Sequence, residues 1–436
     1  MILKINDRNN FLINENKSSN NEFLNVKLLY RYFMGHNKYK KRLKNNINYI
    51  KYLRIPEKIK KENINKLYGN KLTTSVSKLE MFKSCPYEYF LQYSLKLKEK
   101  EELRIRNIDT GSFMHEIIDL FFNELKIKNI DIKEINDELL EKIVNEIINS
   151  KLLDNKYYIF NATKKYVLLV NRLKRIIIKA VKYIIISLNC SDFNILDTEI
   201  SFDEKNGKFK PIIINLDNRK KVEIIGKIDR VDLAKDANNK YVRIIDYKSS
   251  IKDMDFTNIY GGLQLQLITY LDAMCKIEDF IPAGVLYFNL LEQIINSGKK
   301  ITEDEIEEKI KNNFKMKGFI LGDVKVAIMQ DNNLKPSTSS NIIPAYMDKD
   351  GNLSLKKSSA LTLEEFSKLK DFVNKTIIEI SNEILNGNIE LKPYYKNKKT
   401  PCEFCTYKNI CNFNSGIYKT GYRYINTKSK ESFFGN

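Results

Sequence analysis

The feature that most constrains the fold is a change of hydrophobic period near residue 194. From there to residue 290, four segments rich in Ile and Val are separated by turn residues, a pattern typical of strands. The predicted strands are Asn194–Phe202, Lys221–Leu233, Tyr241–Lys248 and Ala283–Leu290. A helical pattern over Leu263–Met274 separates the last two. We therefore predict an α/β fold.

Helical patterns dominate on both sides of these strands. One helix is predicted to begin at a capping box of Ser77 and Glu80, in which each side chain satisfies a free backbone N–H group. A long helix is predicted from Thr362 to Gly387, since glycine often follows a helix end. Other helices are predicted near residues 109–122, 132–148, 164–188 and 303–313, and residues 318–360 are predicted to be irregular.

The charge of the chain leaves two interpretations open. The 436 residues include 74 Lys and Arg against 55 Asp and Glu, a formal net charge of +19. This excess indicates either a solvated lysine-rich surface or affinity for a polyanion such as nucleic acid. No apolar stretch reaches the ~18 residues of a membrane span, and the N-terminus does not resemble a signal peptide. We expect a cytoplasmic protein with no membrane partner, whose six cysteines stay reduced.

Two of the predicted strands carry side chains that suit a metal site. Asp229 lies on one strand, and Asp246 and Lys248 lie two residues apart on the next, so the latter two share a face. Two carboxylates offer hard oxygen ligands to Mg²⁺ or Mn²⁺, and the ammonium can stabilise negative charge on a phosphate. An ordinary surface Asp–Lys pair is the competing interpretation. The apolar run before Asp246 favours the metal site, because buried carboxylates need a partner.

Five motifs in order resemble one nuclease family. They are Thr74–Leu97 (TSVSKLEMFKSCPYEYFLQYSLKL), G-x-x-x-H at Gly111–His115, G-x-x-D…D-x-K at residues 226–248, Q-x-x-x-Y at residues 266–270 and Pro282–Phe288 (PAGVLYF). Together they resemble the RecB-like branch of the PD-(D/E)XK nuclease superfamily, and within it the nuclease region of AddB-type subunits of helicase–nucleases. The resemblance implies a restriction-endonuclease-like core, with a mixed central sheet flanked by helices, helical additions and an Fe–S staple.

The resemblance also implies roles for individual residues. The implied catalytic residues are Asp229, Asp246, Lys248, Gln266 and Tyr270. The implied metal ligands are His115, Glu199, Asp229, Asp246 and the backbone carbonyl of Tyr247. Glu199 is nearly as well explained as a surface residue of a strand, and Gln264 is a weaker candidate for the glutamine of Q-x-x-x-Y.

Four cysteines have the spacing of metal ligands. Cys402, Cys405 and Cys411 form C-x₂-C-x₅-C, and Cys85 lies far upstream. Four thiolates can bind zinc or an iron–sulfur cluster, and the resemblance implies a structural [4Fe–4S] cluster. The other two cysteines, Cys190 and Cys275, lack partners at ligand spacing and are interpreted as small buried hydrophobic residues.

The implied function is that of an Mg²⁺-dependent DNA exonuclease in double-strand-break repair and recombination, with DNA and an AddA-like helicase–nuclease subunit as partners. We predict a basic helical leader at residues 1–70, the nuclease domain at 71–415 and a basic tail at 416–436. The chain has no G-x-x-x-x-G-K-[ST] phosphate loop, so we expect single-stranded or frayed DNA ends as its substrate. A cluster of Lys392, Lys396, Lys398 and Lys399 beside Tyr394 and Tyr395 is a candidate surface for single strands.

Other functions remain open at this point. A non-catalytic subunit that binds DNA ends belongs to a different class, and the complete set of Asp229, Asp246 and Lys248 argues against it. A stand-alone single-strand nuclease of the CRISPR-adaptation type would share the core and the four cysteines. Because only about 70 residues precede the nuclease motifs, a truncated gene, a split subunit and a stand-alone enzyme are all consistent with the sequence.

Overall fold

The computed structural model describes residues 20–51, 58–98, 104–205, 207–216, 220–291, 302–411, 413–414 and 421–435. Parts of the predicted leader and tail lie outside these residues. The described part of the leader forms the helices α2 (Asn20–Gly35), α3 (Asn37–Lys51) and α4 (Lys61–Tyr68). Among all described residues, no helix is both long enough and apolar enough to cross a membrane.

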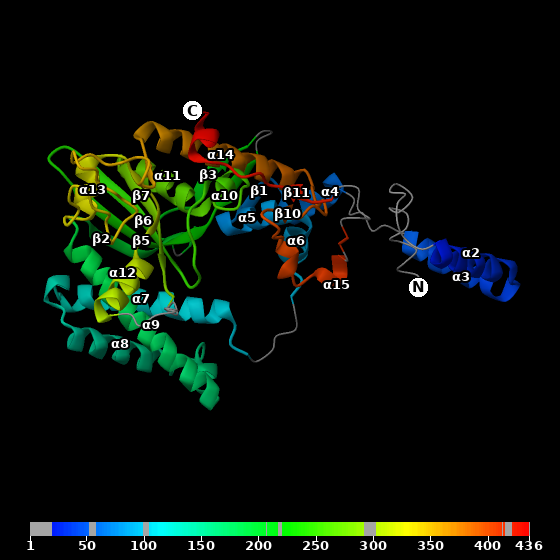
Figure 1. Ribbon diagram of the computed structural model, residues 1–436, viewed down its shortest axis with the longest axis horizontal. Coiled ribbons are helices and arrows are strands. Elements are labelled where there is room, and N and C mark those ends of the chain that lie inside the picture. The colour runs from blue at the N-terminus through cyan, green and yellow to red at the C-terminus, as the bar shows by residue number, and fades with distance from the viewer. Residues whose placement is uncertain are drawn as a thin grey trace.

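A mixed six-stranded sheet forms the centre of the fold (Figure 1). In spatial order, its strands are β2 (Asn194–Phe202), β5 (Gly226–Lys235), β6 (Lys240–Lys248), β7 (Ile281–Asn289), β8 (Lys317–Leu321) and β9 (Ala360–Leu361). Neighbouring strands are antiparallel except for the β6–β7 and β8–β9 pairs. The parallel β6–β7 pair requires a crossover, which contains α10 (Phe256–Tyr260) and α11 (Gln266–Glu278).

Helices cover both faces of this sheet and give three layers (Figure 1). Successive residues of β6 enter different cores, because side chains alternate along a strand: Ile244 packs in the first core and Ile245 in the second. Helices α5 (Val76–Ser84), α11 and α14 (Leu363–Leu385) contribute to the first core. Helices α7 (Asn107–Lys128), α8 (Asp137–Lys151) and α9 (Lys164–Asn189) contribute to the second. The predicted α/β fold with a mixed sheet between helices is confirmed.

The prediction of one strand over Lys221–Leu233 is wrong. The segment divides at Ile225 into β4 (Lys221–Ile224) and β5, which belong to different sheets. In the smaller sheet, β4 lies between β1 (Lys71–Thr74) and β3 (Ile212–Asn215). The reason lies at Gly226, where a Cβ atom would be 2.1 Å from the Tyr270 hydroxyl oxygen. The chain therefore passes close to α11 before it enters the central sheet.

The prediction of an irregular segment over residues 318–360 is partly wrong. It contains most of β8, all of α13 (Val324–Gln330) and the first residue of β9. Strand β8 was hidden because Gly318 weakens the strand pattern. Here the glycine is required, since its φ is +144° and a Cβ would lie 2.1 Å from the carbonyl oxygen of Val285.

The remaining elements surround this core. They are α6 (Pro86–Tyr89), α12 (Glu303–Phe314), α15 (Lys408–Cys411), α16 (Lys430–Phe434), β10 (Tyr394–Tyr395) and β11 (Arg423–Tyr424). As predicted, α14 begins at a capping box, formed by Thr362 and Glu365, and Gly387 follows its end with a φ of +77°. Phe434 of α16 contacts Phe256, so the described part of the predicted tail packs on the nuclease domain.

Candidate active site and cysteine cluster

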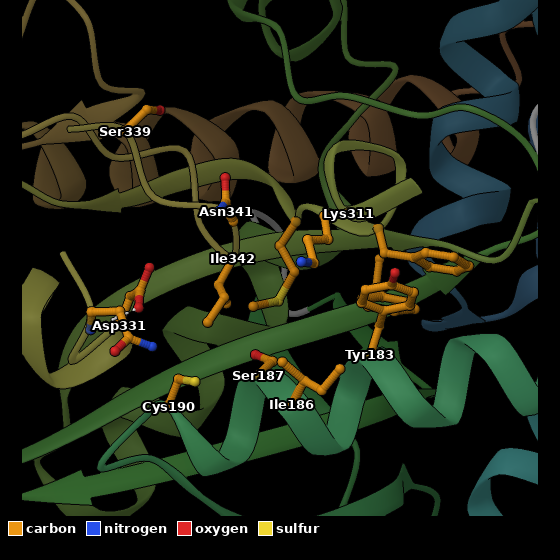
Figure 2. Close-up of a pocket in the computed structure, with 13 residues that line it drawn as sticks. Tyr183, Ile186, Ser187, Cys190, Lys311, Asp331, Ser339, Asn341 and Ile342 are labelled. Atoms are coloured by element: carbon orange, nitrogen blue, oxygen red, sulfur yellow. Dashed lines mark hydrogen bonds between the residues drawn. The ribbon is translucent and has the colours of Figure 1, made fainter. Parts of the chain in front are cut away.

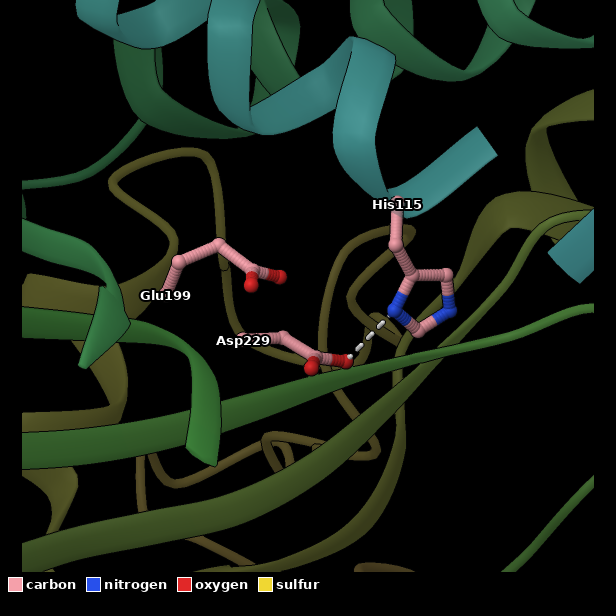
Figure 3. A group of neighbouring side chains, drawn as sticks. All are labelled: His115, Glu199 and Asp229. Carbon is pink, nitrogen blue, oxygen red and sulfur yellow. Dashed lines mark ion pairs between the residues drawn. The ribbon is translucent and has the colours of Figure 1, made fainter. Parts of the chain in front are cut away.

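Three metal-ligating side chains converge where α7 meets β2 and β5. His115 comes from α7, Glu199 from β2 and Asp229 from β5, and one ligand atom of each lies within 4.8 Å of the other two. Figure 3 shows the imidazole directed at the Asp229 carboxylate, with Nδ1 3.2 Å from Oδ2. Burial opposes the charged imidazole, but the hydrogen bond and the charge of Asp229 outweigh it and raise the pKa of His115. Three of the predicted metal ligands therefore lie together.

A glycine one helical turn before His115 lets α7 approach the sheet closely. A Cβ at Gly111 would lie 3.2 Å from the hydroxyl oxygen of Ser249, which directly follows β6. Residues four apart share one face of a helix, so the face that approaches β6 also presents the imidazole. The G-x-x-x-H spacing thus has a packing reason as well as a chemical one.

Glu199 adopts a backbone conformation that non-glycine residues rarely adopt. Its φ is +53° within β2, in the left-handed region. Strand β2 also shifts register against β5 between Ile195 and Asp197. Lys227 of β5 forms an ion pair with the Glu199 carboxylate. Strain of this kind, on the order of 1–3 kcal/mol, concentrates at functional sites. Its position on the metal group therefore favours a functional role for Glu199 over that of an ordinary surface residue.

Asp246 and Lys248 form an ion pair at the end of β6, as their spacing predicts. Lys248 Nζ lies 2.5 Å from Oδ2 of Asp246, whose side chain is 6 % exposed. Burial, together with the charge of Asp229, raises the pKa of the Asp246 carboxyl to about 6. Between the two carboxylates, the backbone N–H of Tyr247 donates to Asp229 Oδ2 at 2.8 Å. The predicted carbonyl ligand of Tyr247 remains a prediction.

This donor set fits a divalent cation. Asp229 and Asp246 are close enough for their charges to repel, so that Asp246 resists ionisation although Lys248 and His115 lie near it. A hard cation bound to their oxygens would relieve this repulsion, and carboxylate with imidazole is a ligand set that Mg²⁺ or Mn²⁺ accepts.

We expect Asp246→Asn to stabilise the metal-free protein at pH 7.5. The pKa of about 6 in the folded protein exceeds the ~3.9 of an unfolded chain. Between these values the native state binds more protons, so the stability that this group contributes falls as the pH rises from about 4 to 6. The amide removes a loss of at most about 3 kcal/mol in the free energy of unfolding. Urea titrations in EDTA from pH 4 to 8 measure this, and a wild type that is the more stable protein at pH 7.5 would contradict it.

The two residues of the Q-x-x-x-Y motif meet on α11. The Tyr270 hydroxyl is hydrogen-bonded to the Gln266 side chain and to the backbone of Lys227, and burial raises its pKa to about 12. Gln264 points elsewhere: its amide bonds the carbonyl oxygen of Asp253 at 2.8 Å and the N–H of Asp255 at 3.1 Å. These contacts favour Gln266 as the glutamine of the motif.

The predicted capping box of Ser77 and Glu80 is wrong. Helix α5 is capped by Ser75, which accepts from Lys78 N. Glu80 instead reaches the first turn of α11, where its Oε1 accepts from the N–H groups of Leu265 and Gln266 at 2.7 and 3.0 Å. A carboxylate is favourable at a helix N-terminus. Sequence spacing suggested only a local partner, so it missed that Glu80 supports the helix that carries Gln266 and Tyr270.

The four cysteines of the predicted cluster lie together although they come from opposite ends of the domain. Cys85 follows α5 and packs beside Leu391 and Cys411. Cys402 is close enough to interact electrostatically with Cys85 and Cys411, and Cys405 with Cys411. Burial raises the pKa of both Cys85 and Cys405 to about 12. These thiols therefore favour the protonated form unless a metal binds, and the set fits a Cys₄ metal group.

Other predicted features have different surroundings. Lys396, from the candidate strand-binding cluster, is held within the fold, since its Nζ contacts Asp255 at 3.3 Å and Asn258. Cys190 and Cys275 are half-buried, so the prediction of buried cysteines is partly wrong. Cys190 faces a cavity of about 210 Å³ between α9, α12 and residues 331–342 (Figure 2). No residue of the metal group lines this cavity.

Comparison with protein families decides the family. The model of the PD-(D/E)XK nuclease superfamily matches residues 73–412, a range that includes the metal group, the Asp246–Lys248 pair and all four clustered cysteines. The chain belongs to the PD-(D/E)XK nuclease superfamily. Members of this superfamily use a divalent metal, in agreement with the donor set at His115, Glu199 and Asp229.

Curated relatives extend the match beyond this domain. The chain is 39% identical over 409 residues to an ATP-dependent helicase/deoxyribonuclease subunit of Clostridium tetani, a match that covers 92% of this chain and 35% of the relative. It is 35% identical over 417 residues to the protein of the same name from Clostridium perfringens, covering 94% and 36%. It is 34% identical over 389 residues to that of Acetivibrio thermocellus, covering 88% and 34%. The resemblance to AddB-type nuclease regions is confirmed. The chain spans about a third of the length of these relatives.

Proposed function

We propose that the chain is an Mg²⁺-dependent exonuclease that hydrolyses DNA phosphodiesters in double-strand-break repair and recombination. The observation that carries the proposal is the group of His115, Glu199 and Asp229 beside the ion pair of Asp246 and Lys248. The word deoxyribonuclease in the names of the relatives supports DNA as the substrate.

The proposed roles follow from the positions of the side chains. His115, Glu199, Asp229 and Asp246 hold the cation, with the Tyr247 carbonyl as a further ligand. When bound, Mg²⁺ or Mn²⁺ neutralises phosphate charge and lowers the pKa of a water molecule. Lys248, held by Asp246, donates its N–H groups to the attacking water or to a phosphate oxygen and so stabilises the charge that develops there. Gln266 and Tyr270 lie on the helix beside β5 and position the strand.

We propose that the cysteines hold a structural [4Fe–4S] cluster rather than zinc. A tetrahedral zinc site with Zn–S bonds of about 2.3 Å brings sulfur atoms to roughly 3.8 Å from one another. Among the described residues, no three of the cysteine sulfurs lie within 4.8 Å of one another. A cubane suits the wider spacing, because each thiolate binds a different iron atom.

We further propose that the nuclease acts with an AddA-like helicase subunit. The sequence contains no phosphate loop to drive unwinding, and the relatives are named as one subunit of a helicase/deoxyribonuclease. A nuclease without a motor should therefore prefer single strands or frayed ends.

The test uses the purified chain with end-labelled single strands and blunt duplex of one sequence. We expect single strands to be degraded from an end in Mg²⁺ and to stay intact in EDTA, while duplex persists with or without ATP. Co-expression with the helicase subunit should give a complex that degrades duplex only with ATP. DNA binding without any cleavage would replace the proposal with an end-binding subunit. Efficient digestion of blunt duplex without ATP would instead indicate a self-sufficient nuclease.

A further inference from the structure

The loop that follows the catalytic strand is held by two buried amide side chains. Asn289 of β7 accepts from the N–H of Lys252 at 3.0 Å and donates to its carbonyl oxygen at 3.3 Å. Gln264 bonds Asp253 and Asp255 in the same way on the C-terminal side of Lys252. Asn289 and Gln264 are each 3 % exposed. The backbone around Lys252 is therefore fixed relative to the end of β6.

This loop places a second lysine beside Lys248. The ammonium groups of Lys248 and Lys252 lie 5.8 and 5.4 Å from the centre of the Tyr287 ring. Tyr287 is the register partner of Asp246 on β7 and is 3 % exposed, so the ring is a rigid platform at the catalytic pair. Within the described part of the chain, Lys252 Nζ makes no ion pair or hydrogen bond of the kind that holds Lys248.

The surroundings of Lys252 disfavour its charge when no substrate is present. Burial lowers the pKa of the Lys252 ammonium, and the charge of Lys248 lowers it further, against the opposing charges of Glu80 and Asp246. Two neighbouring ammonium groups, of which only one has a carboxylate partner, form a site that an anion stabilises.

We propose that Lys252 is a substrate-binding residue that holds a backbone phosphate of the DNA strand next to the phosphate that Lys248 contacts. This inference rests on the proposed nuclease function, because it takes DNA as the ligand. It adds a binding residue outside the D-x-K pair and gives a purpose to the amide clamps of Asn289 and Gln264. Lys252 would then set the position of the strand, while Lys248 acts on the reacting phosphate.

A purely structural role for Lys252 predicts different variants. If its methylene stem only packs on Tyr287, Lys252→Met retains that packing and DNA binding is unchanged. If the ammonium binds phosphate, Lys252→Met weakens binding and Lys252→Arg restores it. Lys235→Met is the matched control, because Lys235 is exposed at the far end of β5 and its loss lowers the net charge by the same amount.

The test measures binding of a single-stranded oligonucleotide by fluorescence anisotropy in EDTA, from 50 to 300 mM salt. We expect Lys252→Met to bind roughly tenfold more weakly at 150 mM salt. The log–log salt slope should fall by about 0.7, the value for one phosphate contact on a single strand. Lys252→Arg and Lys235→Met should keep the slope of the wild type, and thermal unfolding should show that all the variants fold.

Binding and slope in Lys252→Met that equal those of Lys235→Met would overturn the proposal. The measurement does not depend on catalysis, so it separates this inference from the proposed function. A wild type that shows the Lys252 contribution to binding but never cleaves DNA would refute the nuclease proposal alone. In Mg²⁺, the variant should raise the KM for single strands about tenfold while kcat changes less than threefold. A loss confined to kcat would also overturn the assignment.

Discussion

Asp246→Ala is expected to lower the rate of single-strand cleavage in Mg²⁺ by at least about a thousandfold. Asp246 is the buried carboxylate that both faces Asp229 and holds Lys248 at 2.5 Å. Its removal takes away one proposed oxygen ligand and also releases the ammonium from the reacting phosphate. Because two contributions to charge stabilisation are lost together, the effect should exceed that of losing a single positioned group.

The same variant should still bind DNA. Removing a carboxylate makes the site less repulsive to phosphate, so its affinity for single strands in EDTA should equal or exceed that of the wild type. Asp371→Asn, at an exposed position on α14, is the control for a contaminating nuclease and for general loss of negative charge, and should cleave normally. Cleavage by Asp246→Ala at a rate close to that of the Asp371 variant would remove Asp246 from the mechanism.

The central site was predictable because its residues obey local rules. Strand alternation places Asp246 and Lys248 on one face, and the apolar run before them indicates a buried strand end. The four-residue spacing of Gln266 and Tyr270, and of Gly111 and His115, needs only helical periodicity. Patterns of period two or four also located β2, β6, β7 and most helices to within a few residues.

Tertiary contacts decided the features that were missed. The Glu80 carboxylate could have capped its own helix, but α11 offers it two free N–H groups that no local pattern reveals. The strand over residues 221–233 divides because Tyr270, more than 40 residues later, fills the space beside Gly226. Lys252 looked like one lysine among many, and only its position over Tyr287 distinguishes it. The convergence of Cys85 with Cys402 likewise needed a family resemblance, because no periodic rule links residues so far apart.

Cys405→Ser is expected to abolish iron binding and to lower the stability of the whole domain. The wild-type protein, purified without oxygen, should be brown, with broad absorption near 400 nm and about four iron atoms per chain. Serine is a poor ligand for iron, and three thiolates do not complete a Cys₄ cubane, so the variant should be colourless. Cys275→Ser is the matched control, because Cys275 packs against the first core away from the cluster and should keep the full iron content.

The loss of stability should be large because the cluster joins the start of the domain to its end. Cys85 directly follows α5, and Cys402 to Cys411 follow α14, so ligation closes a loop that contains the entire central sheet. Restricting the unfolded chain over a loop of this length is worth up to about 5 kcal/mol by the entropy estimate used for disulfides. The packing of α5 on α14 already links the two ends, which reduces the expected loss to roughly 2–4 kcal/mol. Anaerobic urea titrations of the Cys405 and Cys275 variants measure this difference. Equal stability with equal iron would exclude Cys405 as a ligand, and one zinc per chain without iron in the wild type would replace the cluster with a structural zinc site.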